Sequence, residues 1–154
     1  MGTTMLLRSG FVLAVGAFLG GGALADNCSG RFTNVSQSAE TIDLGKGHTL
    51  TIFSARGSST NDDANSPMFG VGQCGGYVLT TPDGKSRVSY ACARKNKNGD
   101  SWSDSGGIEP GADQGTWKQA GGTGPLAGKN NSGWWKVVVD DGKTTTGVWG
   151  GNCE

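Results

Sequence analysis

Short apolar runs that alternate with polar residues, separated by glycine and other turn formers, recur along most of the chain. The run 48–54 places Leu50 and Ile52 on one face of an extended segment, because successive side chains of a strand point to opposite faces. Residues 40–44 form a similar run, and the residues 45–47 between the two are typical of a tight turn. This period of two predicts antiparallel β-strands rather than helices.

The best-defined unit is a hairpin formed by residues 68–81 and 85–96 around the turn Pro82-Asp83-Gly84. A type I turn with Gly84 in the left-handed conformation pairs Thr81 with Lys85 and thereby sets the register of both strands. The predicted facing pairs are Cys74 with Cys92, Gly76 with Tyr90, and Val78 with Val88.

Four further strands are expected after this hairpin, which bring the total to about eight. They are 101–106, 115–120, 133–139 and 144–149. The dipeptide Asn98-Gly99 is a strong hairpin signal before the first of them. The segment 57–67 has almost no apolar residue and several turn formers, so we expect it to be a surface loop.

The last quarter of the chain carries four of the five tryptophans, Trp117, Trp134, Trp135 and Trp149. Trp134 and Trp135 are adjacent in one predicted strand, so one indole faces the interior and the other covers the outer wall or meets a partner. A two-residue turn at Asp141-Gly142 would place Trp134 opposite Trp149 and Trp135 opposite Val148. A turn longer by one residue would instead place Gly147 opposite Trp135.

The N-terminal residues have the features of a secretory signal. Arg8 precedes the apolar run 11–25, which ends in the small-residue pattern Ala23-Leu24-Ala25. We expect cleavage before Asp26, with residues 1–25 as the signal peptide and 26–154 as a single β-barrel domain in the periplasm or outside the cell. An uncleaved membrane anchor is the alternative, but the run is short for a membrane span and rich in glycine. No stable membrane insertion is expected after cleavage.

The charge balance excludes one class of partner. The chain has 13 basic and 13 acidic residues and a formal net charge of +0. Removal of the signal leaves the mature domain almost neutral, which argues against nucleic acid or an anionic membrane as its partner. The sequence sets no oligomeric state.

All four cysteines lie after the predicted cleavage site, where export makes disulfides the expected state. Four cysteines allow three pairings. The hairpin register favours Cys74–Cys92, which leaves Cys28–Cys153 as a bond that would tie the two ends of the domain together. Zinc is the competing interpretation, but no Cys-x-x-Cys pair is present and His48 is the sole histidine, so we expect no metal and no other cofactor.

Several glycine and aromatic motifs follow one another in the second half of the chain. They are Asn98-Gly99-Asp100, Gly-Thr-Trp at 115–117, Gly-Gly-Thr-Gly-x-x-Ala-Gly at 121–128, Gly-Trp-Trp at 133–135 and Gly-x-Trp-x-Gly at 147–151. In this order they resemble the small secreted bacterial proteins related to allene oxide cyclase and dirigent barrels, over roughly Tyr90 to Cys153. The resemblance implies an eight-stranded antiparallel calycin-type barrel. The chain departs from the family pattern at Pro125-Leu126 and in its four cysteines, and it matches no catalytic residue of the plant cyclases, so no activity is carried over.

The sequence offers no recognisable catalytic machinery. It contains neither a Gly-x-Ser-x-Gly elbow nor a phosphate-binding loop, and His48, Tyr90 and Glu109 are polar candidates without supporting context. The first hypothesis is therefore a non-catalytic barrel that binds a small apolar or aromatic ligand or serves as a structural module. The candidate ligand-binding residues are Trp117, Trp134, Trp135, Trp149 and Tyr90, and the competing interpretation is that the indoles only fill the core.

Two other functions compete with ligand binding. A cyclase- or isomerase-like barrel enzyme would require a polar group inside the barrel. A carbohydrate-binding surface would require an exposed indole platform, for which Trp134 is the candidate. The enzyme hypothesis therefore depends on the interior of the barrel, and the carbohydrate-binding hypothesis depends on its outer face.

Overall fold

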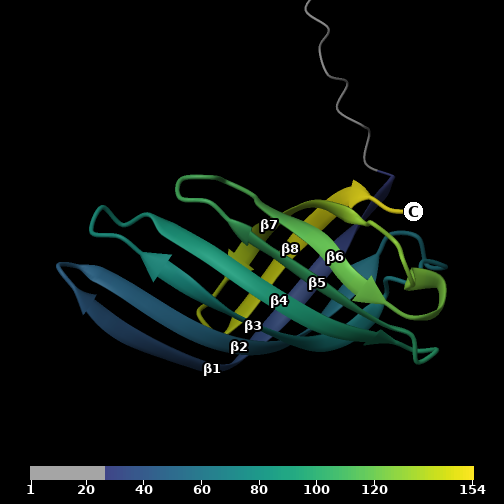
Figure 1. The fold of residues 1–154 in the computed structure, drawn as a ribbon, viewed down its shortest axis with the longest axis horizontal. Coiled ribbons are helices and arrows are strands. Elements are labelled where there is room, and N and C mark those ends of the chain that lie inside the picture. The colour runs from purple at the N-terminus through teal and green to yellow at the C-terminus, as the bar shows by residue number, and fades with distance from the viewer. Residues whose placement is uncertain (1–26) are drawn as a thin grey trace, which may run out of the picture.

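The computed structural model describes residues 27–154, which form a closed barrel of eight antiparallel strands in chain order (Figure 1). The strands are β1 Cys28–Gly45, β2 His48–Asn61, β3 Gly70–Thr80, β4 Ser86–Asn96, β5 Ser101–Ile108, β6 Gly115–Gly122, β7 Ser132–Asp140 and β8 Thr144–Asn152. A 3₁₀ turn, η1 Gly124–Leu126, lies between β6 and β7. The all-β barrel predicted from the sequence is confirmed, whereas the predicted signal peptide 1–25 lies outside the described residues.

The barrel is closed by β1, which pairs with β2 on one side and with β8 on the other. β1 has 18 residues and β2 has 14, whereas β5 and β6 have 8 each. The β1–β2 and β3–β4 hairpins therefore project at the end of the barrel opposite the chain termini (Figure 1). We call this the far end, and the end near the termini the terminal end.

The predicted β3–β4 register is confirmed in full. Cys74 faces Cys92, and the other two predicted pairs also lie opposite each other. The turn is as expected, because Gly84 has a φ of 79° and the Thr81 N–H donates to the Lys85 carbonyl at 2.9 Å. Local turn chemistry was therefore sufficient to place Cys92 opposite Cys74 and Tyr90 opposite Gly76.

One prediction about the first third of the chain is wrong, and another is incomplete. β2 continues to Asn61, so only the second half of the predicted loop 57–67 is irregular. β1 begins at Cys28 rather than near residue 40, because residues 28–35 pair with β8 to close the barrel. The serine, threonine and asparagine residues of this region are held by backbone pairing on both sides, which hydrophobic patterning does not detect.

Both predicted registers of the β7–β8 hairpin are wrong. Trp135 faces Trp149, and Trp134 faces Gly150. A register shift between Val137 and Val139 adds a bulge to β7. In addition, the Asp141 N–H donates to the Thr144 carbonyl at 3.2 Å, so the chain reverses at Gly142 and Lys143, one residue later than predicted. The Asp141 carboxylate holds this turn by accepting hydrogen bonds from the backbone N–H of Lys143 at 2.9 Å and of Thr144 at 2.6 Å.

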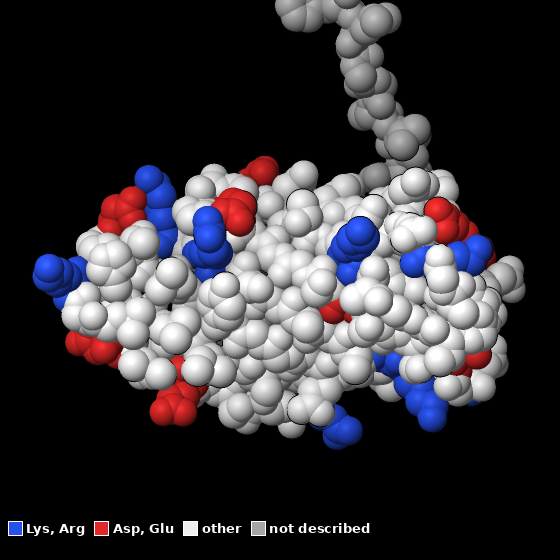
Figure 2. Space-filling view, viewed as in Figure 1, with Lys and Arg blue, Asp and Glu red and all other residues white. Residues whose placement is uncertain are grey.

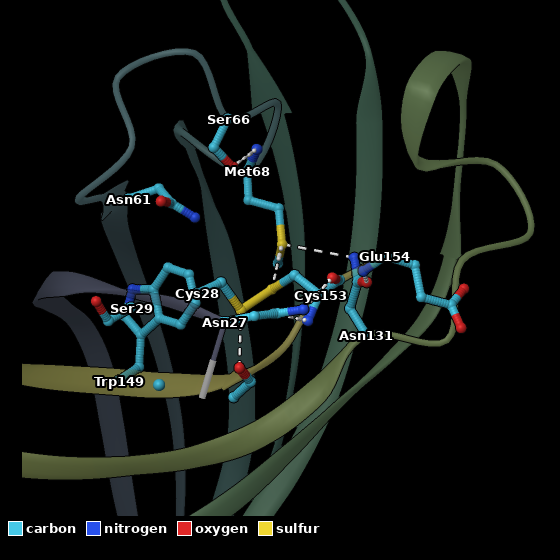
Figure 3. The surroundings of a disulfide bond; sticks show 12 residues. Asn27, Cys28, Ser29, Asn61, Ser66, Met68, Asn131, Trp149, Cys153 and Glu154 are labelled. Atoms are coloured by element: carbon cyan, nitrogen blue, oxygen red, sulfur yellow. Dashed lines mark hydrogen bonds between the residues drawn. A yellow bond between two sulfur atoms is a disulfide. The ribbon is translucent and has the colours of Figure 1, made fainter. Parts of the chain in front are cut away.

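The terminal end is filled by a cluster of buried side chains. It consists of Met68, Trp102, Trp117, Leu126 and Trp149. The Cys28–Cys153 disulfide packs against this cluster beside Met68 and joins the first strand to the end of the chain (Figure 3). Asn27 supports the same junction, since its side chain donates to the Cys153 carbonyl at 2.9 Å.

Interior glycines make room for aromatic rings from neighbouring strands. A Cβ atom at Gly115 would collide with the Trp135 indole, and one at Gly147 would collide with the Phe32 ring. In the same way, a Cβ atom would collide with Trp149 at Gly30, with Trp102 at Gly70, with Phe53 at Gly76 and with Tyr90 at Gly106. These glycines therefore let large rings pack directly against the backbone of neighbouring strands.

Candidate functional site

A cavity of about 450 Å³ occupies the interior of the barrel. It extends from Met68 in the terminal cluster to Asp140 and Thr145 at the far end. Its aromatic walls come from strands all round the barrel and consist of Phe32, Phe53, Tyr90, Trp102, Trp117, Trp135 and Trp149. Because alternate residues of each strand point inward, this combination of side chains follows directly from the strand register.

The cavity also contains a buried ion pair. Arg94 Nε donates to Asp104 Oδ1 at 2.9 Å, and only 9% of each side chain is exposed. Arg94 Nη2 lies 3.3 Å from Cys92 Sγ, so the guanidinium also rests on the interior Cys74–Cys92 disulfide. The pair neutralises its own charges and gives a largely apolar cavity one polar side wall.

Tyr90 adds a phenol to the wall of the cavity. Its ring meets the Trp135 indole edge-on, with ring centroids 5.8 Å apart. Burial, and secondarily the negative charge of Asp104, raise the pKa of the Tyr90 hydroxyl well above its ordinary value. The phenol therefore stays protonated and offers a hydrogen-bond donor to the cavity.

Three of the four candidate tryptophans lie together in the interior with Tyr90. Trp117 and Trp149 form the deep part of the wall, where their rings meet edge to face with centroids 5.7 Å apart. Their indole N–H groups donate to the carbonyls of Gly150 and Thr60 at 3.2 Å and 3.0 Å. These contacts fix both rings, so the two residues act as walls of the cavity and as core.

Trp135 and Trp134 point to opposite sides of β7. Trp135 is half-buried in the cavity, and its indole N–H donates to the Thr116 carbonyl at 3.1 Å. Trp134 is half-buried on the outer wall and does not line the cavity. The structure therefore separates Trp134 from the other candidate residues.

The other polar candidates from the sequence do not line the cavity. His48 is half-buried at the start of β2, and Glu109 is exposed and bonds Arg87 Nη2 at 2.7 Å. Among residues 27–154, no group of three or more His, Cys, Asp or Glu side chains is arranged to hold a metal ion. No helix within this same range is both long and apolar enough to cross a membrane.

Sequence reasoning missed Arg94, Asp104, Trp102 and Asn34 as cavity residues. A signal for Arg94 was available, because it follows Cys92 by two residues and must share its face in the predicted hairpin. Asp104 and Trp102 alternate in the same way along the predicted fifth strand. Nothing in the sequence, however, indicated that this face of the fifth strand pointed inward beside Arg94.

A second, wider depression lies on the outer wall. It has a volume of about 940 Å³, and the exposed side chains of Val35, Arg56, Val71 and Lys95 line it. Figure 2 shows acidic and basic side chains interspersed over one face of the molecule, without a large area of one sign. The inner cavity is the better candidate site, because only there do aromatic walls and buried polar groups converge.

Comparison with known proteins gives two structural likenesses. No family model and no curated protein matches the chain. A pterocarpan synthase dirigent protein, GePTS1, is 13% identical, with a TM-score of 0.48 and coverage of 80% of both chains. Pyocyanin demethylase is 16% identical, with a TM-score of 0.46 and coverage of 79% of this chain and 98% of the other. At this level of similarity neither assigns an activity to this chain, and its membership of the family suggested by the sequence motifs stays a prediction.

Proposed function

We propose that the protein is a ligand-binding barrel that takes a small, mostly aromatic molecule into its interior. The observation that carries this proposal is the cavity of about 450 Å³, which combines aromatic walls with a few buried polar groups. Cavities of roughly 300–1,000 Å³ with this composition are typical of small-molecule sites. Since the terminal end is filled by the Met68 cluster, the ligand enters from the far end.

Within the cavity, Trp135, Tyr90 and Phe32 provide the principal aromatic contacts. Both other rings meet Trp135 edge-on, with centroid distances of 5.8 Å for Tyr90 and 6.3 Å for Phe32. A flat ligand placed among these rings would gain stacking and edge contacts together with burial of its surface. Trp117 and Trp149 would contact the inner end of the ligand.

The test is a fluorescence titration of the oxidised protein with 1-tetralone, which carries an aromatic ring and one carbonyl. The expected result is saturable quenching of tryptophan emission and a higher melting temperature, since a ligand that binds only the folded state stabilises it. Trp135→Phe should weaken binding about tenfold, whereas the matched variant Trp134→Phe should bind like wild type. A flat response of the wild type to 1-tetralone and to the larger aromatic and terpene ketones would contradict the proposal.

A second candidate function is a cyclase- or isomerase-like reaction, and it is favoured by the ionisable groups in the cavity. Tyr90 is suited to donate a hydrogen bond or a proton to an oxygen of a substrate, and Asp104 provides a buried carboxylate nearby. An enzyme of this kind would bind a substrate equally well with Tyr90→Phe but turn it over at least about tenfold more slowly. Unchanged turnover in that variant would remove Tyr90 from a catalytic role.

Export is part of the proposal. Two disulfides are present among the described residues and fit an oxidising environment. We expect the isolated protein to begin at Asp26. Measurement of the intact mass of protein recovered from outside the cytoplasm tests this expectation. Carbohydrate binding through Trp134 has less support, because that indole is half-buried and does not form an exposed platform.

A further inference from the structure

Two buried polar atoms of the cavity walls have no hydrogen-bond partner. In the described part of the chain they are Asn34 Oδ1 and Arg94 Nη1. Both residues line the same inner cavity. Buried polar atoms are almost always hydrogen-bonded in native proteins, so two exceptions in one cavity, one an acceptor and one a donor, require an explanation.

The two residues end the same row of interior positions across four strands. Asn34 on β1 faces Gly57 on β2, Gly57 faces Gly72 on β3, and Gly72 faces Arg94 on β4. The row covers three strand spacings, or about 14 Å along the wall. The two residues between the polar ends are thus both glycines.

Each polar side chain extends over the glycine next to it. A Cβ atom at Gly57 would collide with Asn34 Oδ1, and one at Gly72 would lie 2.9 Å from Arg94 Cγ. The missing side chains therefore leave room for the Asn34 side chain over β2 and for the stem of the Arg94 side chain over β3. The inner wall along this row thus carries an acceptor in the side chain over Gly57 and a donor in the side chain that begins over Gly72.

The contacts of the other two guanidinium nitrogens of Arg94 indicate which ligand groups Nη1 can bind. Nε is occupied by Asp104 at 2.9 Å, and Nη2 contacts the Cys92 sulfur at 3.3 Å. The Asp104 carboxylate balances the guanidinium charge, and both side chains are only 9% exposed. A ligand carboxylate would add an unbalanced negative charge to this apolar cavity, whereas an uncharged carbonyl oxygen would not.

We propose that Arg94 Nη1 and Asn34 Oδ1 form a polar subsite for an uncharged aromatic ligand that carries both a carbonyl and a hydroxyl group. The carbonyl oxygen accepts a hydrogen bond from Arg94 Nη1, and the hydroxyl donates one to Asn34 Oδ1. This subsite rests on the proposed ligand-binding function and narrows it to hydroxy-carbonyl aromatic compounds.

The test compares four probes on the oxidised protein near pH 7. 7-Hydroxy-1-tetralone carries both groups, 1-tetralone only the carbonyl, 5,6,7,8-tetrahydro-2-naphthol only the hydroxyl, and 1-naphthoate a carboxylate. Each hydrogen bond to a buried partner is expected to tighten binding about tenfold. 7-Hydroxy-1-tetralone should therefore bind about tenfold more tightly than either single-group probe, and 1-naphthoate should bind most weakly.

Asn34→Ala gives the decisive variant. In this variant 7-hydroxy-1-tetralone should bind no more tightly than 1-tetralone, so the ratio of the two affinities falls from about ten to about one. Because Asn34 Oδ1 has no protein partner, the variant should unfold at the same urea concentration as wild type or a higher one. A purely structural role for Asn34 would instead lower this midpoint without changing the ratio of the two affinities.

Arg94 is tested in the paired variant Arg94→Met/Asp104→Leu, which removes both charges together. It should lose the preference for the carbonyl and bind 7-hydroxy-1-tetralone no more tightly than 5,6,7,8-tetrahydro-2-naphthol. An unchanged preference in both variants, or tighter binding of 1-naphthoate than of 1-tetralone, would overturn the subsite while leaving the ligand-binding function standing. A wild type that binds none of the four probes would overturn the ligand-binding function and the subsite with it.

Discussion

Arg94 and Asp104 form an ion pair inside the barrel, with Arg94 Nε 2.9 Å from Asp104 Oδ1 and 9% of each side chain exposed. Asp104→Leu leaves the guanidinium buried without a counter-charge, so we expect it to lower the free energy of unfolding by about 3–5 kcal/mol. The double variant Arg94→Met/Asp104→Leu should recover most of that loss, because no charge then remains buried. Urea unfolding of the wild type, the single variant and the double variant measures both effects, and a double variant as unstable as Asp104→Leu would contradict this expectation.

The two disulfides should contribute unequally to stability. Cys28–Cys153 closes a loop with a sequence separation of 125 residues, and Cys74–Cys92 one of 18. On the loop-entropy account, the lower entropy of the cross-linked unfolded chain stabilises the fold by about 5 kcal/mol for Cys28–Cys153 and about 3 kcal/mol for Cys74–Cys92. Replacing each pair by alanines should thus lower the free energy of unfolding more for Cys28–Cys153, as measured by urea denaturation. Equal losses would mean that local packing rather than loop closure determines the contribution.

The glycines beside the interior rings should not tolerate a methyl group. Gly115→Ala places its Cβ against the Trp135 indole, and we expect a loss of about 1–3 kcal/mol from the strain. Gly121→Ala is the matched control, since the nearest atom to its Cβ is Ser103 Oγ at 3.6 Å, an ordinary contact. Thermal and urea unfolding compare the two variants. If Gly121→Ala lowered the stability as much as Gly115→Ala, contact with the Trp135 ring would not be the cause of the loss.

Tyr90 should make the barrel sensitive to alkaline pH. Burial and the charge of Asp104 raise the pKa of Tyr90 above its ordinary value of 10.0, so the unfolded chain loses this proton at a lower pH than the folded one. Stability is then full below about pH 10 and falls above it, by up to about 1.4 kcal/mol per pH unit. The chain has 2 tyrosines, so the Tyr77→Phe protein leaves Tyr90 as the sole phenol to follow by absorbance. Ionisation of Tyr90 near pH 10 in the folded protein would contradict the assignment.

The fold was predictable where turn chemistry is local. The Pro82-Asp83-Gly84 turn determined the β3–β4 register and, through it, the Cys74–Cys92 bond. The β7–β8 register was not predictable, because it depends on a bulge next to Val138 and on the hydrogen bonds of the Asp141 carboxylate. The strand residues 28–35 were missed because their pairing with β8, which closes the barrel, depends on residues more than 100 positions later in the chain.

The candidate site was predictable only in part for the same physical reason. The hairpin register placed Tyr90 opposite Gly76, but the sequence left open which of Trp134 and Trp135 faces the interior. The partnership of Arg94 with Asp104 required the β4–β5 pairing to be known, and the isolation of Asn34 required the β1–β2 pairing. Alternation identifies which residues share a face of one strand, but only barrel closure shows which faces meet.

Nuclear magnetic resonance of the indole N–H groups tests the central claim most directly, since each of the 5 tryptophans gives one such signal. Trp135 lines the cavity and Trp134, its neighbour in the chain, does not, and spectra of Trp135→Phe and Trp134→Phe assign the two signals. Titration with 1-tetralone should shift the Trp135 signal and leave the Trp134 signal in place. A shift of Trp134 alone, or no shift of any indole signal at a saturating concentration, would contradict ligand binding inside the barrel.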